Sequence, residues 1–266
     1  AYGVGPGNAP CYIERTADVK KAVRDIIIGK SFDNGVLCSA PNSAVVDEAV
    51  SEEVRREFVE RGGYFLNDAE RQALATALVT PQRLPNPALV GRSAAYIAEQ
   101  VGIAAPKGTR VLIAPLDGVG RDYPLSIEKL CPVLSYYVVK DWQEGCERCI
   151  QILRYGGMGH TMSIHSNNEE VILQFGLKKP AYRICVNTPT THGSIGLTTG
   201  LDPAMTWPVA VSAAIVFALA LVVQTALGDR VGLPVHGALI AVLAVSALAV
   251  SAGSKSGAGP ILLIIV

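Results

Sequence analysis

Short apolar segments with strand-like composition alternate with amphipathic helical segments between residues 16 and 186. This alternation restricts the fold, because parallel strands need long crossover connections and helices usually supply them. The sequence therefore predicts an α/β domain with a largely parallel sheet. Strands are expected at residues 43–46, 110–115, 133–139, 161–165 and 181–186, and a short helix is expected near 169–175.

Polar side chains that can cap a helix mark where the other helices begin. A side-chain oxygen at the first turn satisfies a backbone N–H that has no partner inside the helix, and a second polar residue three positions later completes a capping box. The candidate caps are Thr16, Ser51 and the pairs Asn67–Glu70 and Asp141–Glu144, and a further short helix is expected at 93–101. The opening residues 1–8, AYGVGPGN, are interpreted as a loop.

Charge and cysteine content exclude several classes of protein. Lys plus Arg and Asp plus Glu both number 23, so the formal net charge is zero. No basic excess is available to neutralise a nucleic-acid backbone, and no nucleic-acid partner is expected. The chain does not open with a charged segment followed by an apolar one, as a secretory signal would. We therefore expect a cytoplasmic domain whose six cysteines are reduced thiols.

The C-terminal part of the chain, residues 207–266, differs in composition from the rest. It contains only Asp229, Arg230 and Lys255 as charged side chains, and residues 207–227 and 235–252 contain none. A helix needs about 20 apolar residues to cross a bilayer. We expect an apolar C-terminal helical hairpin that turns at 228–234, with two possible transmembrane helices and a membrane association. The alternative is two buried helices of a globular protein.

Cys38 closes a segment, SFDNGVLC at 31–38, whose Asn-Gly pair favours a tight turn with positive φ. A cysteine just after such a turn can lie near free backbone N–H groups. Those donors would lower a thiol pKa and could hold an oxyanion. The alternative is a buried cysteine that packs as a small apolar residue.

Several motifs together resemble one enzyme family. GVGPGN at 3–8, SFDNGVLC at 31–38, EKLCPVL at 128–134, GGMGH at 156–160 and RICVNTPTTHGSIG at 183–196 follow the order and spacing of CoA-acylating aldehyde dehydrogenases. The resemblance covers residues 1–206 and implies an aldehyde-dehydrogenase-like catalytic domain. It implies Cys38 as the nucleophile and Glu128 as a contact to the nicotinamide ribose. It also suggests that Asn34 and His160 line the active site, although a loop role for His160 is equally open.

The same resemblance implies a reaction. A small aldehyde would be oxidised to an acyl-CoA through a cysteine thioester, with NAD or NADP as hydride acceptor and coenzyme A as co-substrate. Hydrolytic relatives carry a glutamate base near the position of Val4, and residues 1–12 contain no carboxylate. Without a base, water attacks the thioester slowly. The alternative is that another carboxylate, such as Glu14, serves as the base.

Two departures from the family pattern limit this expectation. The run Ser39-Ala40-Pro41-Asn42 replaces a Ser-Glu or Ala-Ser-Glu run, which leaves the substrate open. The N-terminal cofactor half of the family is not found in this chain, and the apolar tail replaces its glycine-rich end. The alternative function is therefore a catalytically inactive, membrane-tethered fragment. The intact family would be expected to form a homo-oligomer.

Two further motifs are weighed and set aside. Cys146 and Cys149, with His160 and His165, approach zinc-ligand spacing, but both cysteines fall inside a predicted helix and no metal site is expected. The glycines at 3, 5 and 7 do not have the spacing of a dinucleotide fingerprint. Their expected use is a close approach of backbone beside the active site.

Overall fold

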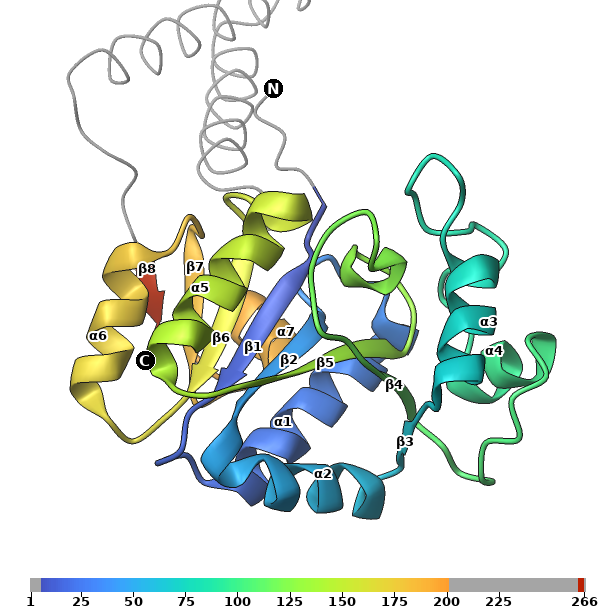
Figure 1. Ribbon diagram of the computed structural model, residues 1–266. Helices are drawn as coiled ribbons and strands as arrows, with labels where there is room; N and C mark the ends of the chain where they lie inside the picture. Colours follow the sequence, from blue (N-terminus) through green and yellow to red (C-terminus); the bar gives the residue numbers. More distant parts are fainter. Residues whose placement is uncertain (1–5, 201–262, 266) are drawn as a thin grey trace, which may run out of the picture. The chain divides into compact units, whose positions relative to one another are not determined.

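The computed structural model describes residues 6–200 and 263–265, and all of them belong to one compact unit. Strands and helices alternate through this unit (Figure 1). The strands are β1 (Ala9–Ile13), β2 (Pro41–Asp47), β3 (Gly63–Phe65), β4 (Val111–Pro115), β5 (Val133–Val139), β6 (Thr161–His165), β7 (Arg183–Val186) and β8 (Leu263–Ile265). The helices are α1 (Val19–Ser31), α2 (Ser51–Glu60), α3 (Asp68–Leu78), α4 (Ala94–Gln100), α5 (Trp142–Ile152), α6 (Glu169–Lys178) and α7 (Thr190–Ser194).

The strands of the described residues form one sheet in the order β3-β4-β5-β2-β1-β6-β7-β8. Every pairing between neighbouring strands of this sheet is parallel. The expected α/β class with a parallel sheet is therefore confirmed. β1 lies between β2 and β6, so the chain builds one half of the sheet from β1 to β5 and then crosses to the other side of β1.

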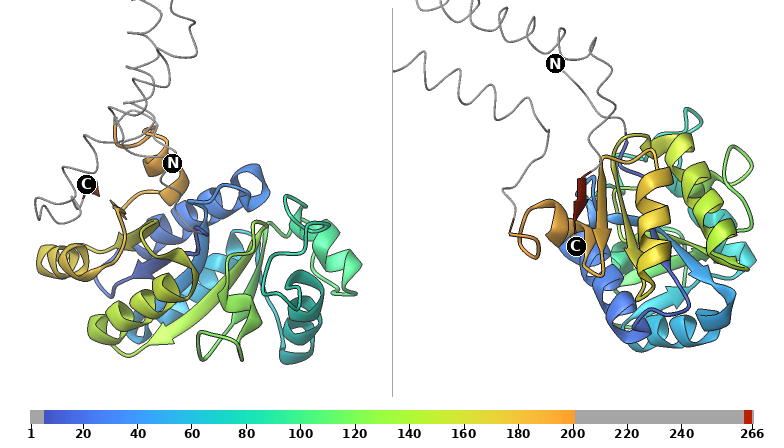
Figure 2. Two further views of the ribbon diagram at one scale, coloured as in Figure 1. Left: turned by 90° about the horizontal axis from the view of Figure 1, so that it is seen from above. Right: turned by 90° about the vertical axis from the view of Figure 1, so that its left-hand side faces the viewer.

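Helices cover both faces of the sheet, with α5 and α6 on one face and α1 and α2 on the other (Figures 1 and 2). Neighbouring residues of a strand point to opposite faces. Tyr12 of β1 accordingly joins the core under α5, whereas Cys11 and Ile13 join the core under α1 and α2. Because both faces of the sheet are buried, the central strands are apolar on both sides and do not alternate apolar with polar residues.

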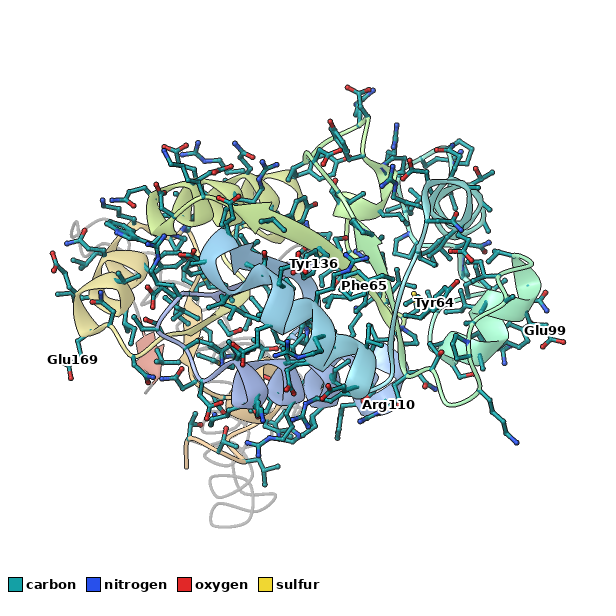
Figure 3. All side chains as sticks on the ribbon, turned by 60° about the horizontal axis from the view of Figure 1, so that its bottom comes forward. Tyr64, Phe65, Glu99, Arg110, Tyr136 and Glu169 are labelled. Atoms are coloured by element: carbon teal, nitrogen blue, oxygen red, sulfur yellow. The ribbon has the colours of Figure 1, made fainter. Side chains whose placement is uncertain are left out.

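Aromatic side chains pack together near α2, in the core that lies under α1 and α2. Phe65 of β3 and Tyr136 of β5 lie edge to face, with ring centroids 5.2 Å apart (Figure 3). Arg55 of α2 lies over the Phe65 ring at 3.9 Å. Glu99 on α4 and Glu169 on α6 mark opposite ends of the described unit in the same view.

Besides β8, two strands were not expected from the sequence. β1, with the sequence APCYI, contains proline and cysteine and no β-branched run, yet all five of its residues are buried at the centre of the sheet. β3 begins at Gly63 and has only three residues, GYF. In both cases the strand is stabilised by its neighbours rather than by its own residue preferences.

Helix caps were predicted with mixed success. The Asn67–Glu70 capping box is present. The short helix expected at 93–101 is α4, although its cap, Ser93, was not predicted. Asp141 accepts the N–H of Glu144, although Glu144 itself binds the N–H of Lys140. The other two predicted caps were wrong: the cap of α1 is Asp18, not Thr16, and Ser51 follows an uncapped Val50 at the start of α2.

The predicted apolar hairpin at 207–252 lies outside the described residues. Within residues 6–200 and 263–265, no helix combines the length and the apolar character needed to cross a membrane. Residues 263–265 form β8, which pairs with β7.

Candidate active site

The candidate site residues lie where parallel strands begin. Gly7 precedes β1, Cys38 precedes β2, Glu128 precedes β5, His160 precedes β6, and Arg183 is the first residue of β7. Because neighbouring strands run in the same direction, their amino ends meet at one edge of the sheet. Motifs that are far apart in the chain are thereby brought to one edge.

A left-handed loop carries the chain from α1 to Cys38. Asp33, Asn34 and Gly35 have φ values of 46°, 49° and 73°. Gly35 is required for a second reason, since a Cβ there would lie 2.8 Å from the carbonyl oxygen of Cys131. The predicted turn before Cys38 is thus present, and it packs against the EKLCPVL segment.

Cys38 differs from the other five cysteines in its exposure. All six lie in the described part of the chain, and Cys38 is partly exposed whereas the others are buried. A thiol must be reachable to act as a nucleophile. Of the six cysteines, Cys38 is therefore the one whose position fits that role.

The surroundings of Cys38 raise its pKa above the usual thiol value. Burial is the main cause, and the negative charge of Glu128 is the second. The backbone N–H groups of Cys38 and Ser39 and the positive charge of Arg183 act in the opposite direction. The expected N–H donors are present, but the net effect is to keep the thiol protonated near neutral pH.

Gly7 lies in contact with both Cys38 and Glu128. Its N–H donates to Glu128 Oε1 at 2.7 Å. A Cβ on Gly7 would lie 1.7 Å from the carbonyl oxygen of Cys38 and 2.7 Å from Glu128 Oε1. No side chain fits there, so the expected close approach of backbone is confirmed at Gly7. Gly3, Gly5 and Val4 lie outside the described residues.

The backbone on both sides of Glu128 is held by one amide side chain. Asn42 Nδ2 donates to the carbonyl of Ile127 at 2.9 Å, and Asn42 Oδ1 accepts the N–H of Lys129 at 3.2 Å. Asn42 Nδ2 also donates to Asn8 Oδ1. Asn42 on β2 therefore fixes the loop that presents Glu128 towards Cys38.

Lys129 also stabilises the loop that carries Glu128. Its ammonium group is fully buried and donates to the carbonyls of Leu125 at 2.7 Å and Ile127 at 3.1 Å, and to Ser135 Oγ at 2.9 Å. Burial holds the pKa of Lys129 well below its usual value. This amine is a structural donor rather than a group open to a ligand.

Glu128 is half-buried, and its pKa is raised. Burial is the main cause, and the Gly7 N–H, Lys30 and Lys129 oppose it. Lys30, at the end of α1, is fully buried, and burial lowers its pKa to about 8. The charge of Glu128 thus acts on the Cys38 thiol, and two buried amines act on Glu128.

His160 and Arg183 are joined through Thr161. Arg183 Nη1 donates to Thr161 Oγ1 at 3.3 Å, and the same oxygen lies 3.0 Å from His160 Nδ1. Burial and the charge of Arg183 lower the pKa of His160, so its ring is neutral at pH 7. The positive charge of Arg183 acts to lower the pKa of both Cys38 and His160, so the two groups share this electrostatic influence.

The motifs that form this edge occur in a known family. The sequence profile described as "Aldehyde dehydrogenase family" matches residues 5–200. The chain belongs to the aldehyde dehydrogenase family. The resemblance predicted from the five motifs is thereby confirmed.

Relatives with acylating activity in their names match the same region of this aldehyde dehydrogenase chain, as does a bifunctional one. The bifunctional aldehyde-alcohol dehydrogenase AdhE of Escherichia coli is 38% identical over 199 residues, which is 74% of this chain and 22% of the relative. The acetylating succinate-semialdehyde dehydrogenase of Clostridium kluyveri is 34% identical over 206 residues, 77% of this chain and 46% of the relative. This chain thus spans less than half the length of either relative.

A solved structure shows the same fold. The acetylating aldehyde dehydrogenase of Geobacillus thermoglucosidasius matches with a TM-score of 0.75 and 43% identity, over 77% of this chain and 45% of that one. The α/β unit with its parallel sheet is therefore an aldehyde dehydrogenase fold, and it contains Cys38.

Asn34 contacts the loop that carries Glu128 only indirectly, through Gly91. Its Nδ2 donates to the carbonyl of Gly91 at 3.0 Å at the surface, and the N–H of Gly91 donates to the carbonyl of Leu130 at 3.0 Å. Asn34 therefore supports the loop that carries Glu128. Within residues 6–200, none of its hydrogen bonds reaches Cys38.

Three further candidates from the sequence were Glu14, His160 and His165. Glu14 is separated from Cys38, and His160 is separated from His165. Glu14 follows the carboxyl end of β1, whereas Gly7 precedes the amino end, so the whole extended strand separates them. Glu14 cannot serve as a base at Cys38. His160 and His165 lie at opposite ends of β6, and among the described residues no group of three metal-ligating side chains converges.

Sequence analysis missed three residues that shape the site. Asn42 and Lys129 lie inside quoted motifs, but their role as clamps depends on burial and on partners that are distant in the sequence. Arg183 opens the RICVNTP motif, and only the register of β7 beside β6 brings it to Thr161. The one signal available in the sequence was Lys129, a lysine directly after the candidate site residue Glu128.

Proposed function

We propose that this unit provides the thiol part of a CoA-acylating aldehyde dehydrogenase, with Cys38 as nucleophile. The observation that carries the proposal is the position of Cys38, partly exposed at the amino ends of the strands and in contact with Gly7 beside Glu128. The names of the relatives, acetylating and acylating, supply the reaction class.

In the proposed reaction, Sγ of Cys38 attacks the aldehyde carbon and forms a thiohemiacetal. Backbone N–H groups at Cys38 and Ser39 lie near the sulfur and are placed to stabilise negative charge there. Loss of a hydride to the acceptor and of the hydroxyl proton to solvent converts the thiohemiacetal to a thioester on Cys38. The sulfur of coenzyme A then attacks the thioester carbonyl, releases the acyl-CoA and restores the Cys38 thiol.

A bound nicotinamide cofactor, NAD or NADP, would accept the hydride. Glu128 fits a ribose contact, because its half-buried carboxylate is an acceptor and is fixed beside Cys38 by Gly7 and Asn42. Asn42 and Lys129 would position Glu128, and Asn34 would support the same loop through Gly91. His160, neutral and hydrogen-bonded near Thr161, would line the wall on the β6 side.

The choice of coenzyme A over water is supported by the place of the carboxylates. Glu14, the alternative base considered from the sequence, lies at the opposite end of β1. In the proposed reaction Glu128 contacts the cofactor ribose and does not activate water. Attack by water without a positioned base is slower by about 10²–10⁴-fold, so the thioester would persist until a thiol nucleophile reaches it.

The test measures aldehyde-dependent formation of NADH or NADPH by the chain, with and without coenzyme A, and the identity of the product. We expect an acyl-CoA as product and loss of turnover in Cys38→Ser. Cys131→Ser, which alters a buried cysteine close to the same loop, is the matched control and should keep turnover. Free carboxylic acid as the main product, or turnover retained in Cys38→Ser, would overturn the proposal.

A second measurement isolates the thiol from the cofactor. Brief alkylation with iodoacetamide followed by peptide mass spectrometry should modify Cys38 first, because the other five cysteines are buried. Absence of turnover with a readily alkylated Cys38 would show an accessible thiol in a unit that does not catalyse the reaction alone.

A further inference from the structure

A lysine and a cysteine meet in the core between α5 and α6, away from Cys38. Lys179, directly after α6, places its Nζ 2.6 Å from Sγ of Cys146 on α5. Hydrogen bonds from nitrogen to oxygen are typically about 2.9 Å long, and sulfur is larger than oxygen. The two atoms are therefore closer than an ordinary hydrogen bond between these elements.

The surroundings keep this pair together. Cys146 and Lys179 are both largely buried, at 5% and 6% exposure. Lys179 Nζ also lies 3.8 Å from the centre of the Phe175 ring. Within residues 6–200, Lys179 forms no ion pair with a carboxylate. The sulfur is therefore the main polar partner of a buried amine.

A second cysteine lies one helical turn away. Cys149 is fully buried on the same helix, and burial raises its pKa to about 12. Among charged groups, Lys179 and Cys146 affect this pKa most. Cys149 is thus an alternative partner for an oxidised Cys146.

We propose that Cys146 and Lys179 form a modification site, in which a peroxide links Sγ to Nζ through one oxygen atom. The first peroxide converts the Cys146 thiol to a sulfenic acid and is reduced to water. The second peroxide takes the sulfenic hydrogen and one hydrogen of the Lys179 NH₂ group as the O–N bond forms, and is reduced to two waters. The S–H bond and one N–H bond break, S–O and O–N bonds form, and four electrons pass to the two peroxides.

The bridge would join α5 to the segment that follows α6. α5 continues into a π-helical turn, Leu153–Gly157, and Gly157 lies against the backbone of Gly7 and Asn8. A Cβ on Gly157 would be 3.1 Å from the carbonyl oxygen of Gly7. The modification site therefore fixes the helix that leads to the amino-end edge of the sheet.

The chain can be tested directly, because trypsin separates the three groups. Cleavage yields peptides 141–148 with Cys146, 149–154 with Cys149, and 179–183 with Lys179. After treatment with hydrogen peroxide and alkylation of remaining thiols, we expect 141–148 linked to 179–183. The linked mass should equal the two peptides plus one oxygen and minus two hydrogens, and a thiol reductant should release both.

Three variants make the assignment. Cys149→Ser keeps both bridging groups and should form the linked peptide as the wild type does. Cys146→Ser and Lys179→Arg should reduce the linked species to background. The wild-type spectrum is decisive even if a variant fails to fold. A disulfide between 141–148 and 149–154, or sulfinic acid on 141–148 with 179–183 unmodified, would overturn the proposal.

Discussion

The two ends of the parallel sheet are built differently. At the carboxyl ends, polar side chains bind one another: Glu14 Oε2 accepts the N–H of Thr16 at 2.8 Å and the hydroxyl of Ser166 at 2.9 Å, and Asp47 accepts Arg15 Nε at 2.9 Å. At the amino ends, Cys38 is partly exposed and Glu128 is half-buried. Open α/β sheets usually bind ligands at their carboxyl ends. Here that edge carries internal hydrogen bonds, and the proposed chemistry lies at the other edge.

This difference lies in what each end leaves exposed: both ends contain stabilising hydrogen bonds, whereas the amino end also leaves Cys38 partly exposed. Hydrogen bonds at the carboxyl ends satisfy buried carboxylates and so stabilise the unit. At the amino ends, glycine at position 7 leaves room for a thiol and a carboxylate to approach each other. Changes at the two ends should therefore have different consequences, which the following variants measure.

The largest effect is expected from Gly7→Ala. The added Cβ would overlap the carbonyl oxygen of Cys38, so the backbone must move away from the thiol. A displacement of about 1 Å at a reacting group can cost about 100-fold in rate. We expect aldehyde turnover to fall at least about 100-fold, with a change in the rate of Cys38 alkylation. Gly156→Ala, whose Cβ would make an ordinary 3.4 Å contact, is the control and should retain activity.

The next largest effect is expected from Lys129→Met. The variant removes the donor that binds the carbonyls of Leu125 and Ile127 and the hydroxyl of Ser135. Leaving buried acceptors unpaired costs about 2–3 kcal/mol of unfolding free energy. Urea denaturation measures this loss, and Lys140→Met at an exposed position should lose less than about 0.5 kcal/mol. Equal stability of the two variants would show that the buried amine does not hold the Glu128 loop.

His165→Gln tests the carboxyl-end side of the sheet through pH. Burial lowers the pKa of His165 to about 4, from 6.5 in an unfolded chain. Between these values the unfolded state binds a proton that the folded state does not, so stability falls as the pH decreases. One pKa unit corresponds to about 1.4 kcal/mol, so this residue accounts for about 2 kcal/mol of loss from pH 7 to pH 5.

We expect His165→Gln to lack that share of the pH dependence in urea denaturation at the two pH values. The wild-type protein, denatured at the same two pH values, is the reference. If the unfolding free energy of His165→Gln fell from pH 7 to pH 5 by as much as that of the wild type, the assignment of a neutral, buried imidazole would be contradicted.

Glu128→Gln should produce the smallest change, in the pH profile of Cys38. The carboxylate charge is the second cause of the raised thiol pKa, after burial. Its removal should shift the pH dependence of iodoacetamide alkylation to lower pH, while burial keeps part of the elevation. Glu14→Gln, at the opposite end of β1, should leave the profile in place. A shift to higher pH in Glu128→Gln would mean that the carboxylate does not act on the thiol through its charge.

The sequence by itself determined the fold class, most of the helices and the family. Helix periodicity and the Asn67–Glu70 cap are local patterns, and they survive into the structure because their hydrogen bonds join residues within one turn. The order of the motifs was enough to predict the family and to single out Cys38 as the candidate nucleophile. β1 was not predicted, because APCYI has weak strand preference and becomes a strand only between β2 and β6.

Tertiary structure alone decided the relations among these residues. It placed Glu128 beside Cys38 through Gly7, clamped the loop with Asn42, and set Glu14 at the far end of β1. It also decided that burial outweighs the backbone N–H groups at the thiol, so that its pKa is raised where the sequence suggested a lowered one. The reason is physical: desolvation and contacts between distant segments depend on how strands pair, and no local pattern encodes them.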